Sequence, residues 1–348
     1  MPLKERILIA PLDWGLGHAT RCVPIIHRQL DAGHEVMLAA CGIGAAFFRK
    51  QFSGLTLLED IPSYGISYQD KGSFVWQLVK QVPHIFYVVK AENLWLKKVI
   101  DREKITQVIS DNRYGLHSDS ITCFFITHQL FIKGPMVTVP VIKNLVKKYV
   151  VKYNECWVPD FEGEKNLSGE LSHGKLFTDN VKYIGPLSRF EHSMKPTQNQ
   201  LEMKYDFLAL ISGPEPQRTL LENQLEEIFK SIGKPALMIC GRPQDSSQQQ
   251  NGCVRKVSHL NDDEFVRAID ESKMIICRSG YSTLMDLYAL KRKALLIPTP
   301  GQTEQEYLGK YFAEKFGFAT MSQKDVSVKA LKSISDSNLL STEFYFDA

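Results

Sequence analysis

Short apolar runs alternate with amphipathic stretches along the first half of the chain, a pattern typical of parallel strands joined by helices. The stretch from Cys22 to Gly33 has helical spacing and ends at a glycine. The apolar runs predict strands at residues 6–13, 34–42, 105–111, 121–129, 155–161 and 181–186.

A polar stretch between Pro186 and Lys204 loses this periodicity, which indicates a linker. The pattern then restarts, and segment 244–252, rich in Gln and Ser, is expected to be a flexible loop. Strands are predicted at 205–213, 235–241, 253–260, 274–280, 294–300 and 318–322, and helices at 219–233, 262–273, 281–291 and 304–317.

Two strand–helix series predict an α/β protein with two facing Rossmann-like doubly wound domains and a ligand cleft between them. We expect the first domain at residues 1–188, the linker at 189–204 and the second domain at 205–348, with the last residues packing back on the first domain.

Composition narrows the class of protein. The chain has 348 residues, 44% of them hydrophobic, which suffices for two cores. Its seven cysteines are scattered and form no CxxC pair, which argues against a disulfide framework or a zinc ribbon and favours a reducing compartment. No apolar run reaches the roughly 18 residues of a membrane span. The apolar run near the N-terminus is too short for a signal peptide, so we expect a cytoplasmic protein.

Positive charge gathers in the first half, where residues 1–190 hold 23 Lys and Arg against 18 Asp and Glu. Neither an arginine cluster nor a nucleic-acid motif accompanies it, so no nucleic-acid partner is expected. Residues 74–100 and 131–153 combine lysines with aromatic or apolar side chains, which predicts contact with an anionic membrane surface. In the second segment a helix would place on one face Val141, Ile142, Leu145, Val146 and Tyr149. Packing of that face on the protein core is the alternative.

The turn Gly15–His18 follows a strand and opens a helix, so its N–H groups can face an anion. It is not a dinucleotide fingerprint, because Thr20 stands at the third glycine position. Imidazole titrates near neutrality, which makes His18 a candidate general base, with a helix cap as the alternative. The strand-end carboxylates Asp111 and Asp13 could orient this base or replace it.

The second half offers groups suited to a nucleotide. Ser212, Gly213 and Arg218 follow a strand and suit a diphosphate, although an ordinary turn would use the same residues. A second strand-end turn is made by Arg278, Ser279 and Gly280, and the helix after it carries Tyr281, Ser282, Thr283 and Asp286. A helix carboxylate can accept both hydroxyls of a ribose, and amides and carboxylates suit a sugar; the loop offers Gln302, Gln305 and Glu306. No D-x-D pair or His/Cys cluster is present, so no metal is expected.

The order of these motifs over residues 207–320 resembles glycosyltransferase family 28. The motifs are an R-S-G turn, a helix acid, a P-x-P loop and a Gln-rich helix start. The resemblance implies a GT-B fold in which the backbone near Leu260 contacts uracil, Ser279–Thr283 face the diphosphate and Asp286 binds ribose. It further implies that Gln305 and Glu306 meet the sugar. Asp286 stands where the family usually has Glu, and Glu306 where it has a second Gln.

We therefore predict an inverting, metal-independent glycosyltransferase that moves a sugar from a UDP-sugar to a hydroxyl of a lipid-linked or membrane-associated glycan. The UDP-sugar is a co-substrate, and no further cofactor is expected. Such an enzyme would be peripheral on the inner face of the plasma membrane. His18 is the first candidate for the base, and Asp111 the second. A UDP-sugar epimerase of the same architecture and a non-catalytic nucleotide-binding partner subunit are the alternatives. The sugar, the acceptor and the oligomeric state stay open.

Overall fold

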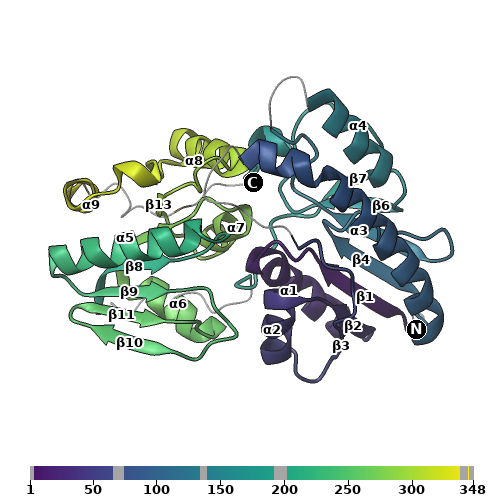
Figure 1. The fold of residues 1–348 in the computed structure, drawn as a ribbon, viewed down its shortest axis with the longest axis horizontal. Helices are drawn as coiled ribbons and strands as arrows, with labels where there is room; N and C mark the ends of the chain where they lie inside the picture. Colours follow the sequence, from purple (N-terminus) through teal and green to yellow (C-terminus); the bar gives the residue numbers. More distant parts are fainter. Residues whose placement is uncertain (1–3, 66–73, 134–138, 192–201, 338–343, 345–348) are drawn as a thin grey trace. The chain divides into compact units, whose positions relative to one another are not determined.

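A computed structural model describes residues 4–65, 74–133, 139–191, 202–337 and 344 (Figure 1). The chain divides into two compact units. Most residues up to Leu187 form the first unit, and the chain from Ser188 onward forms most of the second. Each unit has a sheet and hydrophobic clusters of its own.

Within the described residues, the first unit holds a seven-stranded parallel sheet in the order β3-β2-β1-β4-β5-β6-β7. Its strands are β1 (Arg6–Pro11), β2 (Glu35–Ala39), β3 (Thr56–Leu58), β4 (Gln107–Asp111), β5 (Thr122–Ile126), β6 (Glu155–Val158) and β7 (Val181–Tyr183). The order runs outward in both directions from β1, so the connecting helices cover both faces.

The helices of the first unit bury apolar stripes against this sheet. They are α1 (Leu16–Asp31), α2 (Gly42–Gln51), α3 (Phe74–Glu103), α4 (Val139–Val150) and the short 3-10 helix Gly169–Leu171. Leu96 and Val99 of α3 and Val146 of α4 are buried in the same cluster as Leu8 of β1. These amphipathic helices therefore take most of their stability from packing on the sheet.

The second unit holds, in the residues that the structure describes, a seven-stranded sheet in the order β10-β11-β9-β8-β12-β13-β14. Its strands are β8 (Tyr205–Leu210), β9 (Ala236–Ile239), β10 (Gln248–Asn251), β11 (Val254–Val257), β12 (Ser272–Cys277), β13 (Leu295–Leu296) and β14 (Ala319–Thr320). Its helices are α5 (Gln217–Ile232), α6 (Asp262–Asp270), α7 (Tyr281–Ala289), α8 (Thr303–Phe316) and α9 (Val328–Asp336), with a 3-10 helix at Gln323–Asp325.

The prediction of a flexible loop at 244–252 is wrong for residues 248–251. Gln248–Asn251 forms β10, which pairs antiparallel with β11 through a turn at Gly252 with φ +61°. All four side chains of β10 are exposed, because an edge strand can be held by backbone hydrogen bonds without apolar side chains. Helices α2 and α9 and strand β3 were also not predicted.

Part of the predicted linker, 192–201, and the last residues, 345–348, lie outside the described residues. Phe344 is buried within the second unit, where its ring contacts Tyr288, Phe312 and Phe318.

Each sheet has one place where the strand order reverses direction. In the first unit it lies between β1 and β4, and in the second between β8 and β12. Ligands of doubly wound sheets bind outside the carboxyl ends of the strands at such a point. The residues that follow these four strands are therefore the first place to look for a site.

No helix in the described part of the chain is long and apolar enough to cross a membrane.

Candidate functional site

The first unit brings His18 and Asp111 together at its topological switch point. Asp111 is the last residue of β4, and His18 lies in the first turn of α1, directly after β1. The Nδ1 atom of His18 lies 3.2 Å from Oδ2 of Asp111. The Asp111 carboxylate is fully buried, whereas the His18 side chain keeps 16% of its surface exposed. A solvent-facing imidazole is thus held by a buried acid.

Two residues that the sequence analysis did not single out complete this cluster. Arg21 donates from Nε to Asp111 Oδ2 at 2.7 Å and pairs through Nη2 with Oδ1. Its Nη1 lies 2.9 Å from Nδ1 of His128, which follows β5, and its Nη2 lies 2.9 Å from Nδ1 of His18. A signal for Arg21 existed in the sequence, since it is three residues from His18 and shares its helix face.

The charges in this cluster set its ionisation. Burial opposes ionisation of Asp111, but the charges of Arg21 and His18 outweigh it and lower the pKa of Asp111 to about 2. For His18, burial and then the charge of Arg21 lower the pKa from its usual 6.5, against the opposing effect of Asp111. At neutral pH the acid is therefore ionised and the imidazole is neutral, the state a general base requires.

Asp13 lies between β1 and the glycine turn that opens α1, but its contacts are with residues other than His18. Its Oδ2 accepts from the Ser63 hydroxyl at 2.5 Å and from the Tyr64 N–H at 3.0 Å, and its Oδ1 is 3.6 Å from Arg113. These contacts fix the loop after β3. No hydrogen bond in the described residues links Asp13 to His18.

The α1 helix begins at the glycine turn with no side chain capping its N–H groups. Gly15 has φ +121°, a conformation that L-residues with a side chain rarely adopt, and the Thr20 hydroxyl donates to the carbonyl of Gly17. The backbone N–H groups at the start of α1 can therefore face a negative charge.

In the second unit, Asp286 lies on α7, the helix that follows β12 at the switch point. Its Oδ1 accepts a 2.6 Å hydrogen bond from the hydroxyl of Ser188. Burial raises the pKa of Asp286 to about 6, although Arg189 and the Ser188 hydroxyl act in the opposite direction. Ser188 was not predicted, because a polar linker gives no signal for such a contact.

The α7 turn presents mainly backbone to a ligand. Gly280 is the N-cap, no side chain caps the helix, and the Tyr281 ring is buried. The half-buried Ser282 and Thr283 stand in the first helical turn. Ser279 is fully buried, and its hydroxyl donates to the carbonyl of Gln305 at 2.7 Å, so it ties α7 to α8.

The predicted sugar-binding side chains order the loop between β13 and α8. Gln305 accepts from the N–H of Thr299 at 2.9 Å and donates to Gln302, while Glu306 accepts from the N–H of Gly301 at 2.9 Å. These bonds bring Gln302, Gln305 and Glu306 together at one strand end. Leu260 is half-buried and follows β11, directly ahead of the α6 N-cap at Asn261.

Arg278 lies buried beneath the turn after β8. Its guanidinium donates to the carbonyls of Ile297 at 3.1 Å and Gln217 at 2.8 Å, and to the Gln323 side chain. A Cβ placed on Gly213, whose φ is +107°, would lie 4.0 Å from Arg278 Nε and 3.5 Å from the Thr299 hydroxyl. Both of these atoms are buried without a hydrogen-bond partner. Burial lowers the pKa of Arg278 to about 10, so it is still a cation at neutral pH.

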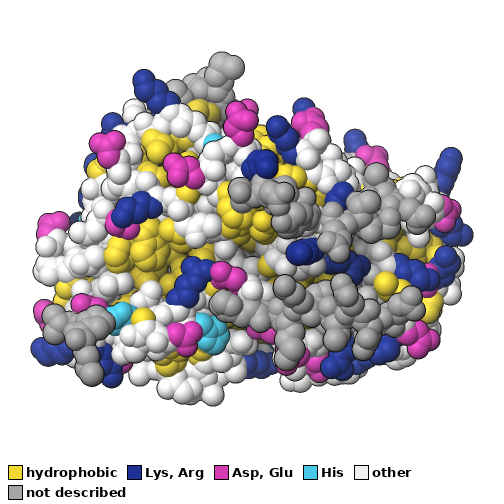
Figure 2. All heavy atoms as spheres, turned by 180° about the vertical axis from the view of Figure 1, so that it is seen from behind, with side chains coloured by type: hydrophobic (Ala, Val, Ile, Leu, Met, Phe, Trp, Pro, Cys, Tyr) yellow, Lys and Arg dark blue, Asp and Glu magenta, His cyan; other side chains and the backbone are white. Residues whose placement is uncertain are grey.

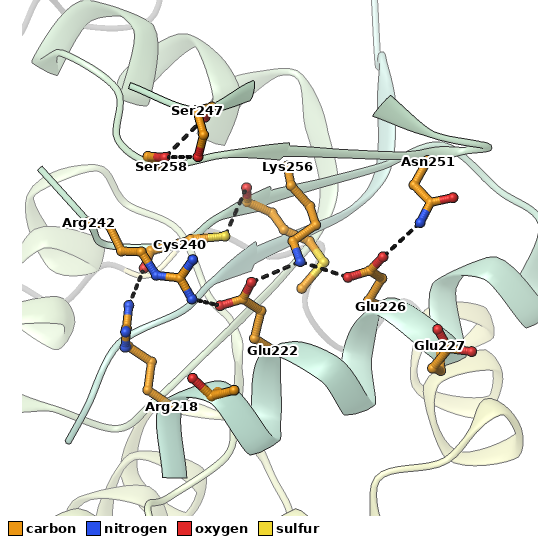
Figure 3. Close-up of polar contacts among 12 residues, drawn as sticks. Arg218, Glu222, Glu226, Glu227, Cys240, Arg242, Ser247, Asn251, Lys256 and Ser258 are labelled. Carbon is orange, nitrogen blue, oxygen red and sulfur yellow. Dashed lines mark hydrogen bonds and ion pairs between the residues drawn. The ribbon is translucent and has the colours of Figure 1, made fainter. Parts of the chain in front are cut away.

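Arg218 does not point freely at the Ser212–Gly213 turn. It donates to the carbonyl of Cys240 at 3.1 Å (Figure 3). It also pairs with Glu215. Beside it in Figure 3, Glu222 of α5 lies between Arg242 and Lys256, 2.8 Å from each. Arg218, Arg242 and Lys256 are therefore each neutralised by a carboxylate.

The two basic segments of the first unit differ. In α4, Val146 is buried and Ile142 packs against the same core, so the apolar face of this helix is used in folding. In α3, Phe86 is 41% exposed and Tyr87 71% exposed. Hydrophobic patches with Lys and Arg side chains among them are visible on the face drawn in Figure 2.

Within the described ranges, no three His, Cys, Asp or Glu side chains form a group that could hold a metal ion.

Comparison with known proteins gives a family match for part of the second unit. Residues 217–343 match the glycosyltransferase family 28 C-terminal domain. Two proteins of Methanosarcina acetivorans, each described as an uncharacterized glycosyltransferase, are similar over most of the chain. One is 27% identical over 86% of this chain and 81% of its own length. The other is 22% identical over 86% and 79%.

Solved structures agree in fold. MurG of Acinetobacter baumannii has a TM-score of 0.54 at 12% identity, covering 97% of this chain and 92% of that one. The glycotransferase of kitacinnamycin has a TM-score of 0.64 at 12% identity, with 97% and 91% covered. UGT89C1 of Arabidopsis thaliana, solved with UDP-L-rhamnose, has a TM-score of 0.60 at 11% identity, with 97% and 90% covered. Two Rossmann-like sheets in one chain are the GT-B fold, as predicted.

Proposed function

We propose that this chain, a glycosyltransferase of the GT-B type whose residues 217–343 match the family 28 C-terminal domain, transfers a sugar from a UDP-sugar with inversion and without a metal. The acceptor is a hydroxyl of a lipid-linked or membrane-associated glycan. Two residues after β12 carry the proposal: the buried cation Arg278, which follows the strand directly and has no carboxylate partner among the described residues, and the half-buried acid Asp286 on α7.

The unpaired charge of Arg278 supports binding of a diphosphate. Arg242 and Lys256 share the carboxylate of Glu222, whereas no described carboxylate forms an ion pair with Arg278. A buried charge is costly unless a counter-charge lies near it. A diphosphate on the Gly213 turn would supply that counter-charge, assisted by the N–H groups at the start of α7. The same groups would stabilise the diphosphate as it leaves.

Asp286 and the Gln-rich loop suit the rest of the donor. The carboxylate oxygen of Asp286 that Ser188 does not hold can accept hydrogen bonds from ribose hydroxyls. The backbone near Leu260 would contact uracil. The side chains gathered by the loop after β13, Gln302, Gln305 and Glu306, would meet the sugar hydroxyls.

His18 takes the proton of the acceptor hydroxyl in this proposal. The acceptor oxygen forms a bond to the anomeric carbon as the bond from that carbon to the diphosphate breaks, and the proton moves to Nε2 of His18. This requires the tautomer whose Nδ1–H donates to Asp111 Oδ2, in which Arg21 Nη2, although close to the same Nδ1, donates to Asp111 Oδ1 and not to the imidazole. A single displacement inverts the anomeric centre. Burial, and after it the charge of Arg21, lower the pKa of His18 and keep its imidazole neutral beforehand.

His18 and Asp286 predict different pH effects. His18 must be unprotonated, and its pKa is lowered from 6.5, so kcat is expected to fall on acidification with a midpoint below 6.5. Asp286 must be ionised, and its pKa is about 6, so the donor KM is expected to rise as the pH falls through about 6. Initial rates between pH 4.5 and 8 separate the two. A kcat that grows as the pH falls would contradict the role of His18.

The exposed aromatic side chains of α3 support a membrane-associated acceptor. The double change Phe86→Ser and Tyr87→Ser is expected to lower sedimentation of the chain with phosphatidylglycerol vesicles, because aromatic side chains anchor a basic surface at the lipid interface. Leu176→Ser, at a residue 39% exposed in the same unit, is the matched control. If the unchanged chain stays in the supernatant with these vesicles, the membrane part of the proposal is wrong.

A further inference from the structure

The chain enters the second unit through three residues that are held on α6 and α7. Ser188 and Phe190 are each 2% exposed. The Phe190 ring stacks on Phe265 of α6, with centroids 5.0 Å apart and planes 12° apart. Arg189 lies over both rings, at 4.6 and 5.0 Å from their centroids, and its Nη1 is 2.8 Å from Asp262 Oδ1. This entry segment, residues 188–190, is therefore a fixed part of the second unit.

The direction of the Ser188 hydroxyl follows from its two neighbours. The N–H of Phe190 lies 3.1 Å from Ser188 Oγ, and Oγ lies 2.6 Å from Asp286 Oδ1. A backbone N–H can only donate, so Ser188 Oγ accepts from Phe190 and uses its single proton for the carboxylate. Ser188 is thus a donor aimed at Asp286 by the entry segment.

One oxygen of Asp286 is consequently held while the other has no hydrogen bond from the described side chains or backbone. A carboxylate with one oxygen anchored has its plane and its rotamer set. A pre-organised acceptor binds a ligand better because its side chain loses little conformational entropy on binding.

We propose that Ser188 is a positioning residue for the nucleotide donor: its hydroxyl holds one oxygen of Asp286 so that the other is presented to the ribose hydroxyls. This inference rests on the proposed function, in which Asp286 binds ribose. It assigns a role in donor binding to the segment at which the chain passes into the second unit.

The charges around Asp286 mean that this role of Ser188 can be tested through the pKa of Asp286. Burial raises the pKa of Asp286, and Asp262 on α6 acts in the same direction. Arg189 and the Ser188 hydroxyl lower it. Removing the hydroxyl therefore raises the pKa of Asp286 further. Since the ionised form accepts both ribose hydroxyls, nucleotide affinity would then be lost at a higher pH than in the unchanged chain.

The test is the Kd for UDP of Ser188→Ala, measured by titration calorimetry between pH 5 and 8.5. At pH 8 we expect binding about tenfold weaker than in the unchanged chain, the size of one hydrogen bond to a charged group. The midpoint of the loss of affinity should move to higher pH, and kcat at saturating donor should be unchanged. Ser188→Thr keeps the hydroxyl and should restore both values. Ser333→Ala, at an exposed position of α9, is the matched control.

The possible outcomes distinguish the positioning role of Ser188 from the proposed binding of ribose by Asp286. If Asp286→Ala loses affinity but Ser188→Ala keeps the Kd and the pH profile of the unchanged chain, the positioning role is wrong and the ribose role stands. A weaker Kd with an unmoved pH profile also overturns it, because a merely structural loss would not shift a titration. If the unchanged chain does not bind UDP, the proposed function and this inference fail together.

Discussion

Replacing His18 by Ala is expected to lower kcat for sugar transfer by about a hundredfold or more, the usual contribution of a general base. The Kd for UDP should not change, because His18 belongs to the first unit and the proposed nucleotide groups belong to the second. UDP release at saturating donor and acceptor measures the first quantity, and titration calorimetry the second.

The matched control is His27→Ala, which removes an exposed imidazole from the same helix. It should leave kcat unchanged. Asp111→Asn is expected to be impaired as well, since it removes the charge that stabilises His18 once it is protonated. If His18→Ala turns over as fast as the unchanged chain, the base is another group, and His128 beside Arg21 is the next to change.

Replacing Asp286 by Ala is expected to weaken UDP binding by about a hundredfold. Two hydroxyls donating to a carboxylate are worth about 3 kcal/mol, which corresponds to that factor in Kd. Asp336→Ala, at the exposed end of α9, is the control and should bind UDP normally.

A ligand without the hydroxyls makes this prediction specific to ribose. The 2′,3′-dideoxy form of UDP should bind the unchanged chain and Asp286→Ala with the same weak affinity, because the interacting pair is incomplete in both cases. If Asp286→Ala weakens UDP and its dideoxy form equally, the carboxylate acts on the fold of the site and not on the ribose.

Turnover distinguishes the alternatives to a transferase. An epimerase would convert a UDP-sugar with no acceptor present, and a non-catalytic subunit would bind UDP without ever consuming a donor. The cluster of His18, Arg21 and Asp111 supports an acid–base step in the first unit, which a binding subunit does not need.

The fold could be predicted largely because buried parallel strands give continuous apolar runs. The runs around β1, β4, β8 and β12 stand out for this reason, and the two-sheet architecture follows from their alternation with helices. The edge strand β10 gave no such signal, since all of its side chains are exposed and it is held through its backbone. A single sequence shows side chains and not backbone pairing.

The candidate site, like the fold, could be predicted only in part. His18, Asp111, Arg278 and Asp286 could be named because each lies at the end of a strand or in the turn and helix that follow one, where chain order indicates a ligand. Their partners could not, because the contact between Arg21 and His128 joins residues 107 positions apart, and that between Ser188 and Asp286 joins residues 98 apart. Such contacts depend on how helices and loops that are distant in sequence pack together in the folded chain.

The most direct test of nucleotide-sugar binding is the melting temperature of the chain with and without UDP, GDP, TDP and ADP. A ligand that binds only the folded state raises the melting temperature in proportion to the logarithm of its concentration. We expect UDP to raise it, and Asp286→Ala to abolish the effect. If none of the four nucleotides changes the melting temperature, Arg278 and Asp286 serve the architecture of the second unit, and the proposed UDP-sugar transfer is contradicted.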